Sequence, residues 1–131
     1  GITLDPRLVV MDVRGVDTAH RAVTGLLTSA EPPTALLTGQ NLITIGAIHA
    51  LQPLGLQHRV ALMGFDDFPL ADLLDPGVSV VSQDPTAIGR TAAELLFARL
   101  DGDRRPPQHV VVPTRLIARG SGELRPDLRA R

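Results

Sequence analysis

Short apolar runs alternate with longer segments of helical periodicity along the chain, and this alternation limits the folds that it can adopt. The runs expected to form strands are 8–11, 34–38, 59–64 and 78–83. The segments with helical spacing are 17–29, 41–52, 68–74 and 84–102. Strands that alternate with helices through short connections predict an α/β fold with a mainly parallel sheet.

Residues typical of helix ends support these boundaries. We expect Asp17 and Asn41 to cap the first two helices, and Asp84 to cap the last, with Pro85 in its first turn and Gly102 at its end. The apolar residues of the last helix are predicted to form its buried stripe: Ile88, Ala92, Leu95, Leu96 and Leu100. The segment 109–119 reads as extended, with Pro113 favouring an edge or a bend.

Composition excludes several classes of protein. The 131 residues suffice for one domain, and a net charge of −1 gives no basic excess for nucleic acid. The lack of cysteine excludes disulfides, thiolate zinc sites and cysteine nucleophiles. No apolar run approaches the roughly 18 residues of a membrane span, and no signal peptide is visible.

No motif for catalysis or for a cofactor stands out. The sequence holds no G-x-S-x-G elbow, no P-loop and no G-x-G-x-x-G motif. Its four histidines are scattered, without the close pairing that a metal site needs. We therefore expect neither an enzyme nor a bound metal or cofactor.

Polar residues follow three of the predicted strands, at 39–41, 64–67 and 82–84. In open α/β sheets, ligands bind outside the carboxyl ends of the strands. Each position also has a structural interpretation. Asp66 and Asp67 fit either a cap for the helix at 68–74, with Pro69 in its first turn, or a ligand contact. Gln40 is either a solvated loop residue or an amide offered to a ligand.

Three long stretches resemble the LacI family of bacterial transcriptional regulators. They are PTALLTGQNLITIGAIHALQPLGL, VALMGFDDFPLADLLDPGVSVVSQDPTAIGRTAAELLFARLDG and PPQHVVVPTRLIARGSG, within residues 8–122. The resemblance implies a doubly wound, periplasmic-binding-protein-like fold of type I, of which this chain corresponds to the C-terminal half. By similarity, residues 1–77 and 113–122 belong to the C-terminal subdomain, 78–112 to the N-terminal subdomain, and 123–131 form a mobile tail. The helix at 84–102 would then pack on a subdomain that this chain does not contain, so in this chain we expect Ile88, Leu95 and Leu96 to be exposed or covered by another copy.

The resemblance also implies candidate site residues. Asp66, the first Asp of GFDD, is the strongest effector contact, and Gln83 lies beside the cleft. Gln40 replaces the usual Asn of the strand-end Asn-Asp pair. Arg14 stands roughly where an aromatic commonly stacks on the ligand, so it either favours an acidic ligand or faces solvent. The expected dimer interface includes Ile45, Ile48, Leu70 and Leu73.

The implied function is the effector-binding and dimerisation region of a cytoplasmic, DNA-binding transcriptional regulator. A sugar or sugar-like effector would control operator binding, which would occur through a helix-turn-helix that this sequence lacks. The alternative is a periplasmic-type sugar-binding protein of a transport system.

Overall fold

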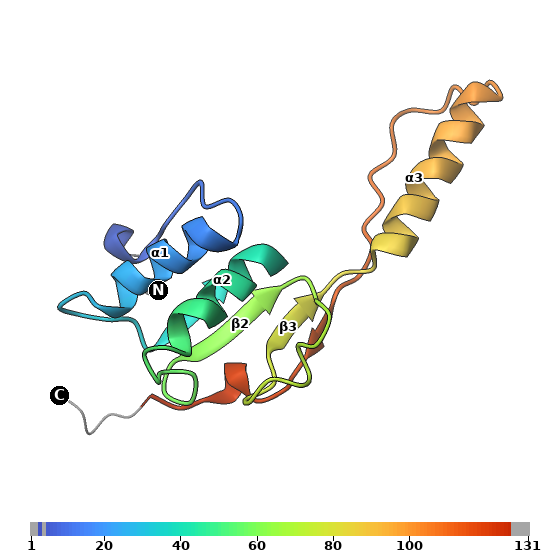
Figure 1. The fold of residues 1–131 in the computed structure, drawn as a ribbon. Coiled ribbons are helices and arrows are strands. Elements are labelled where there is room, and N and C mark those ends of the chain that lie inside the picture. Colours follow the sequence, from blue (N-terminus) through green and yellow to red (C-terminus); the bar gives the residue numbers. More distant parts are fainter. Residues whose placement is uncertain (1–2, 4, 127–131) are drawn as a thin grey trace.

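A computed structural model describes residue 3 and residues 5–126 of the chain, which form a small α/β layer with a projecting helix (Figure 1). The strands are β1 (Ala35–Thr38), β2 (Ala61–Phe65), β3 (Ser79–Ser82) and β4 (Arg115–Ile117). The helices are α1 (Val16–Leu27), α2 (Asn41–Leu51) and α3 (Pro85–Leu100), with short 3-10 turns η1 (Pro6–Leu8) and η2 (Ser121–Glu123).

The four strands form one sheet in the order β1-β2-β3-β4. The first three strands are parallel, and β4 returns antiparallel along β3. The predicted α/β class with a mainly parallel sheet is confirmed, and so is the extended segment that carries β4.

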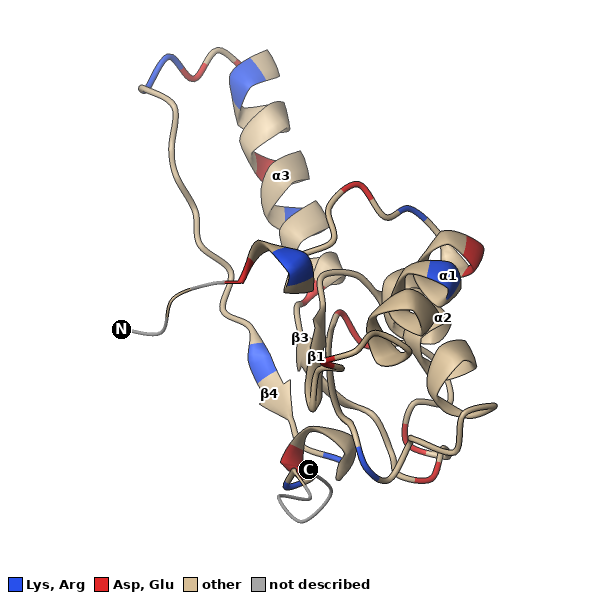
Figure 2. Cartoon of the chain, turned by 90° about the vertical axis from the view of Figure 1, so that its left-hand side faces the viewer, with Lys and Arg blue, Asp and Glu red and all other residues tan. Residues whose placement is uncertain are grey.

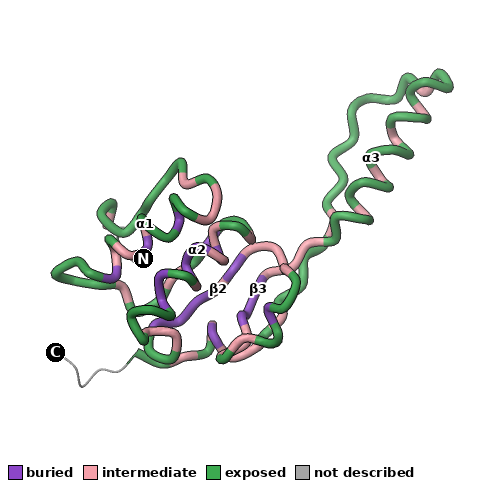
Figure 3. The backbone as a smooth tube through the Cα atoms, in the orientation of Figure 1, coloured by how far each residue is buried: buried purple, intermediate pink, exposed green. Residues whose placement is uncertain are grey.

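Helix α2 lies on one face of this sheet, and α1 packs against α2, so that both helices contribute to the core on this side (Figures 1 and 3). The buried residues of this core come from both helices, the strands and the connecting loops: Val23, Leu27, Ala47, Ala50, Leu51, Val60, Leu62, Ala71, Val78 and Val80. Register places Leu37, Met63, Val81 and Leu116 on the opposite face, because side chains alternate along a strand. Leu37 and Leu116 are exposed there.

Helix α3 does not join this core. The chain leaves the sheet after Ser82, runs out along α3 and comes back to the sheet only at Arg115 (Figure 1). None of the residues of α3 is buried, so the stripe predicted from its periodicity stays exposed or half-buried in the described chain, as expected for a helix that packs on a missing subdomain (Figure 3). The returning segment lies beside Leu95 and Leu96 through Pro107 and Gln108, but it leaves no residue of α3 buried.

Two helix caps differ from the prediction by one or two residues. Gly15, at φ +80°, precedes α1, and Asp17 lies inside the first turn instead of capping it. Gln40 holds the cap position of α2, and Asn41 is the first helical residue. The prediction for α3 is confirmed, because the Asp84 carboxylate accepts a 2.9 Å hydrogen bond from the Ala87 amide and Gly102 follows at φ +95°.

Two predicted elements do not form. The run 8–11 is exposed and unpaired; an isolated strand lacks partners for its backbone groups. The segment 68–74 makes turns instead of a helix. Leu70 adopts φ +70°, which interrupts right-handed helical geometry, and Pro69 supplies no amide hydrogen.

The end of the chain is anchored as far as Glu123. The Glu123 carboxylate accepts hydrogen bonds from the Ser79 hydroxyl and the Gly120 amide, both at 2.9 Å. The mobile tail was predicted to start at this residue, and its last part, 127–131, lies outside the described residues.

Candidate functional site

Asp66 lies directly after β2, at the carboxyl edge of the parallel strands. Its backbone adopts φ +70°, a left-handed conformation that aspartate tolerates better than most residues. Its amide donates a 2.9 Å hydrogen bond to the Val81 carbonyl, which extends the pairing of β2 with β3 by one residue. Asp66 is therefore the last residue of this segment to pair with β3, and the chain turns away from the sheet there.

The structure joins Asp66 to Gln83, the residue that follows β3. The Gln83 side-chain amide donates a hydrogen bond of 2.5 Å to the Asp66 carboxylate, and both residues are half-buried. Two residues that are separated by 17 positions thus meet at one edge of the sheet, as the strand-end rule predicts.

Asp67 has a different environment from its neighbour. Both of its carboxylate oxygens accept hydrogen bonds from the Arg119 guanidinium, each at 2.8 Å. One of them also accepts from the Phe68 amide at 2.9 Å. The paired guanidinium lowers the pKa of Asp67 below its ordinary value. Asp67 is therefore structural, although it caps a turn and not the predicted helix.

Gln40 ends the turn after β1, at the same edge of the sheet. Its carbonyl accepts hydrogen bonds from the Thr44 amide and hydroxyl, at 2.9 and 3.0 Å. The buried Thr44 hydroxyl also bonds to the Thr38 hydroxyl at 2.7 Å. This threonine pair fixes the Gln40 backbone, while the Gln40 side chain is exposed and makes no capping bond.

Arg14 shares no described hydrogen bond with the other three predicted effector residues. It is exposed in the loop before α1, and the described hydrogen bonds do not connect its side chain with Asp66, Gln83 or Gln40. Of the four predicted effector residues, the structure brings Asp66 and Gln83 into contact and leaves the other two without such a link.

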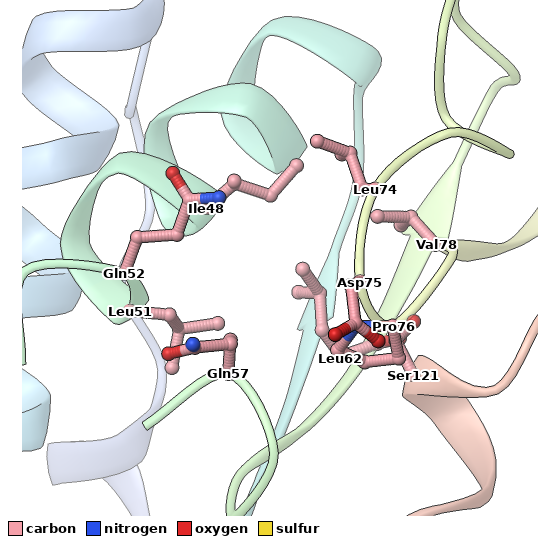
Figure 4. A pocket seen from close by; sticks show the side chains of 10 residues that line it. All are labelled: Ile48, Leu51, Gln52, Gln57, Leu62, Leu74, Asp75, Pro76, Val78 and Ser121. Atoms are coloured by element: carbon pink, nitrogen blue, oxygen red, sulfur yellow. The ribbon is translucent and has the colours of Figure 1, made fainter. Parts of the chain in front are cut away.

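The residues predicted for a dimer interface differ in exposure. Leu70 and Leu73 are 65% and 74% exposed on the turns after β2, whereas Ile45 and Ile48 of α2 are half-buried. A small, mostly apolar hollow lies beside Ile48, between the end of α2 and the 74–78 loop (Figure 4). Its lining includes none of the predicted effector residues.

Sequence reasoning missed Arg119, Thr38 and Thr44. Arg119 lies in the TRLIARGSG stretch, which contributes to the family resemblance, but nothing local connects it with Asp67. The two threonines have no sequence signal beyond their position at a strand end and in the following helix.

The described residues offer little for other kinds of site. They contain no group of three or more His, Asp or Glu side chains that could hold a metal ion. Within the same residues, no helix is long and apolar enough to cross a membrane. Basic and acidic residues are interspersed along the described chain (Figure 2).

The sequence matches the family of periplasmic binding protein-like domains over residues 1–122. A similar relative is the HTH-type transcriptional regulator PtxS of Pseudomonas aeruginosa, 40% identical over 98 residues. The match covers 73% of this chain and 29% of PtxS. The chain thus spans less than a third of the length of this relative.

Two solved structures share the fold. The Escherichia coli transcriptional repressor ascG is 29% identical, with a TM-score of 0.75 over 92% of this chain and 44% of that one. A LacI family transcriptional regulator from Arthrobacter sp. FB24, in complex with lactose, is 28% identical, with a TM-score of 0.70 over 83% of this chain and 42% of that one.

Proposed function

Because the chain belongs to the periplasmic binding protein-like domain family, in the form found in LacI-family transcriptional regulators, we propose that it forms the C-terminal part of an effector-binding domain. In the complete regulator, this domain would bind a small sugar-like effector and pair with a second copy. Operator DNA would be bound by a helix-turn-helix outside this sequence.

The observation that carries the proposal is the contact of Asp66 with Gln83 at the carboxyl edge of the sheet. A carboxylate accepts strong hydrogen bonds from hydroxyl groups, which sugars present in quantity. The second oxygen of Asp66, Oδ2, takes part in none of the described hydrogen bonds. Asp66 therefore offers an acceptor at the edge where ligands of such sheets bind.

The projection of α3 supports a two-part domain. Its apolar residues need a packing partner, and a second subdomain would supply one across the cleft. Binding of an effector between two such parts would change their closure. That change would alter the spacing of two paired DNA-binding heads.

For the dimer interface we propose a surface that includes Leu70 and Leu73 on the turns after β2 and Ile45 and Ile48 of α2. Exposed leucines on neighbouring turns are typical of a surface that a partner covers.

The proposed regulator would act in the cytoplasm, without catalysis and without a cofactor. A sugar-binding protein of a transport system is less well supported, because PtxS and ascG are both named transcriptional regulators.

Calorimetric titration of the full-length protein with neutral sugars, sugar acids and sugar phosphates tests the effector site. The informative variant is Asp66→Asn, since asparagine tolerates the left-handed backbone while the negative charge is removed. We expect its affinity for the best ligand to fall about tenfold or more, because hydrogen bonds to charged groups contribute about 1.5–3 kcal/mol. The matched control is Asp17→Asn, at an exposed position of α1. Equal affinities for Asp66→Asn and the unaltered protein would refute the assignment.

A further inference from the structure

Two buried threonines lie beside the candidate site, at the carboxyl edge of the sheet. Thr38 ends β1 and Thr44 lies in the first turn of α2, and they are 5% and 0% exposed. Their hydroxyl oxygens are 2.7 Å apart, so one hydroxyl donates to the other. The second hydroxyl proton reaches the Gln40 carbonyl, 3.0 Å from Thr44 Oγ1, or the Met63 carbonyl, 3.3 Å from Thr38 Oγ1. The pair thus lies between the turn after β1 and strand β2.

Gly64 allows this pair to approach β2 closely. In the sheet, Thr38 is paired with Gly64, which stands two residues before Asp66. A Cβ added at Gly64 would lie 2.8 Å from the Thr44 hydroxyl oxygen and 3.1 Å from its Cγ2. Thr44 therefore occupies the space that a side chain on β2 would need, where α2 lies over this strand (Figure 1). This contact joins the strand ends that carry Gln40 and Asp66.

We propose that Thr38 and Thr44 are positioning residues of the effector site, which fix the Gln40 turn relative to the end of β2 that carries Asp66. The inference rests on the proposed function, because it concerns the same site. Both threonines are buried, so their hydroxyls are not available to a ligand. A buried hydroxyl without a partner is unfavourable, and this pair keeps its partners only while the turn and β2 keep their spacing. A ligand that bonds to both strand ends then meets them already in place.

Calorimetric titration of the full-length protein with neutral sugars, sugar acids and sugar phosphates tests this role. Thr44→Val keeps the shape of the side chain and removes its hydroxyl, whereas Thr44→Ser retains the hydroxyl. We expect Thr44→Val to weaken the binding of the tightest sugar about three- to tenfold, the contribution of one buried hydrogen bond, and Thr44→Ser to preserve it. Thr38→Val and Thr44→Val combined should weaken binding by less than the sum of the single effects, since both remove the same bond.

Two control variants separate positioning from overall stability. Thr24→Val removes a buried hydroxyl of α1 that has no partner among the described hydrogen bonds, so its affinity should equal that of the unaltered protein. Ser121→Ala breaks buried hydrogen bonds away from the site, so it should lower the stability and leave the affinity unchanged. An affinity that falls in Ser121→Ala as much as in Thr44→Val would show that the threonines act only on stability, and would overturn the proposal.

Hydrogen exchange measured by mass spectrometry reports on the Gln40 turn of the full-length protein without any ligand. The Thr44 amide donates to the Gln40 carbonyl at 2.9 Å. In Thr44→Val we expect the peptide that contains residues 39–44 to exchange about threefold faster or more, and in Thr44→Ser at the rate of the unaltered protein. Equal exchange in Thr44→Val and the unaltered protein would overturn the positioning role.

The variant Asp66→Asn distinguishes a failure of the positioning role from a failure of the site. Weaker binding in Asp66→Asn, with unchanged binding in Thr44→Val, would overturn the positioning role and leave the effector site intact. Unchanged binding in Asp66→Asn, with faster exchange in Thr44→Val, would reject the effector site, although the threonine pair would still hold the turn.

Discussion

The carboxylate of Asp67 and the guanidinium of Arg119 form a two-bond ion pair across 52 positions of the sequence. Arg119 also donates to the Val78 carbonyl at 3.1 Å. Its side chain thereby ties the returning segment after β4 to the turn after β2. Asp67 is held in this way, whereas the carboxylate of Asp66 accepts a hydrogen bond from the Gln83 side chain alone among the described hydrogen bonds.

This ion pair should make stability depend on pH in the acid range. Arg119 lowers the pKa of Asp67 in the folded state, so the pair stabilises the fold above the ordinary aspartate pKa of about 3.9. The stabilisation, about 1 kcal/mol for a partly exposed pair, should be lost as the pH falls below about 4 toward the folded pKa. Urea unfolding of the unaltered chain and of Asp67→Asn at several pH values measures this.

For Asp67→Asn we expect a lower stability at neutral pH and a shallower loss of stability below about pH 4. The control Asp17→Asn should retain the acid dependence of the unaltered chain, since Asp17 is exposed. Identical acid dependence in Asp67→Asn and the unaltered chain would contradict a stabilising role for the pair.

Two helical glycines form a matched test of the packing between α1 and α2. A Cβ added at Gly46 of α2 would lie 2.5 Å from the Ala19 Cβ and 2.5 Å from the Val16 carbonyl oxygen. A Cβ added at Gly25 of α1 would meet nothing within 4 Å. We expect Gly46→Ala to destabilise the fold by about 1–3 kcal/mol through overpacking. Gly25→Ala should be neutral or stabilise it by up to about 1 kcal/mol.

Thermal unfolding of both glycine variants distinguishes packing from helix propensity. Alanine favours a helix over glycine at either position, so propensity alone would raise the stability of both. A gain in stability for Gly46→Ala equal to that for Gly25→Ala would show that the two helices do not approach closely in solution.

Loss of the buried Ser121 hydroxyl should lower the stability of the fold, although the group is small. It accepts a 2.9 Å hydrogen bond from the Ser79 amide and donates a 2.7 Å bond to the Leu62 carbonyl. Ser121→Ala leaves the Ser79 amide without its acceptor, and an unsatisfied buried group costs about 1–3 kcal/mol. Urea unfolding measures the loss, with Ser29→Ala as an exposed control. Equal midpoints for the two variants would argue against the buried network.

The ends of α3 were predicted correctly from local sequence, whereas the caps of α1 and α2 were misplaced by two residues and one residue. Asp84, Pro85 and Gly102 bound α3 because each acts on its own backbone and its immediate neighbours. The helix predicted at 68–74 was wrong, because the conformation of this segment depends on a residue that is distant in the sequence. Arg119 engages Asp67, and Leu70 adopts a left-handed backbone that no local pattern indicates.

The candidate site was predicted in part for a related reason. The strand-end rule needs only strand order and direction, so it correctly placed Asp66 near Gln83. It does not say which way a side chain in a long loop points, and it therefore gives no position for Arg14. Periodicity predicts which residues of α3 share a face, but it does not show whether the described chain contains an element that buries them.

The exposed apolar residues of α3 lead to a prediction about self-association. Leu96 and Leu100 are 58% and 72% exposed on the helix, and Val111 of the returning segment is 75% exposed. Apolar surface of this kind is expected to be covered by a second copy when the 131-residue chain is studied alone. Light scattering over a range of concentrations should show a mass that rises toward that of a dimer or a larger assembly.

Substitution of this surface identifies which part of the chain associates. The double variant Leu96→Gln and Leu100→Gln should lower the mass at a given concentration, because it replaces exposed apolar area without touching the core. The pair Leu70→Gln and Leu73→Gln serves as the comparison, since it alters the other exposed leucine surface. If only the variant with Leu70→Gln and Leu73→Gln associates more weakly, the contact between copies lies on the turns after β2. A monodisperse monomer at high concentration would show that α3 remains solvated, and that its apolar residues are not a contact between copies.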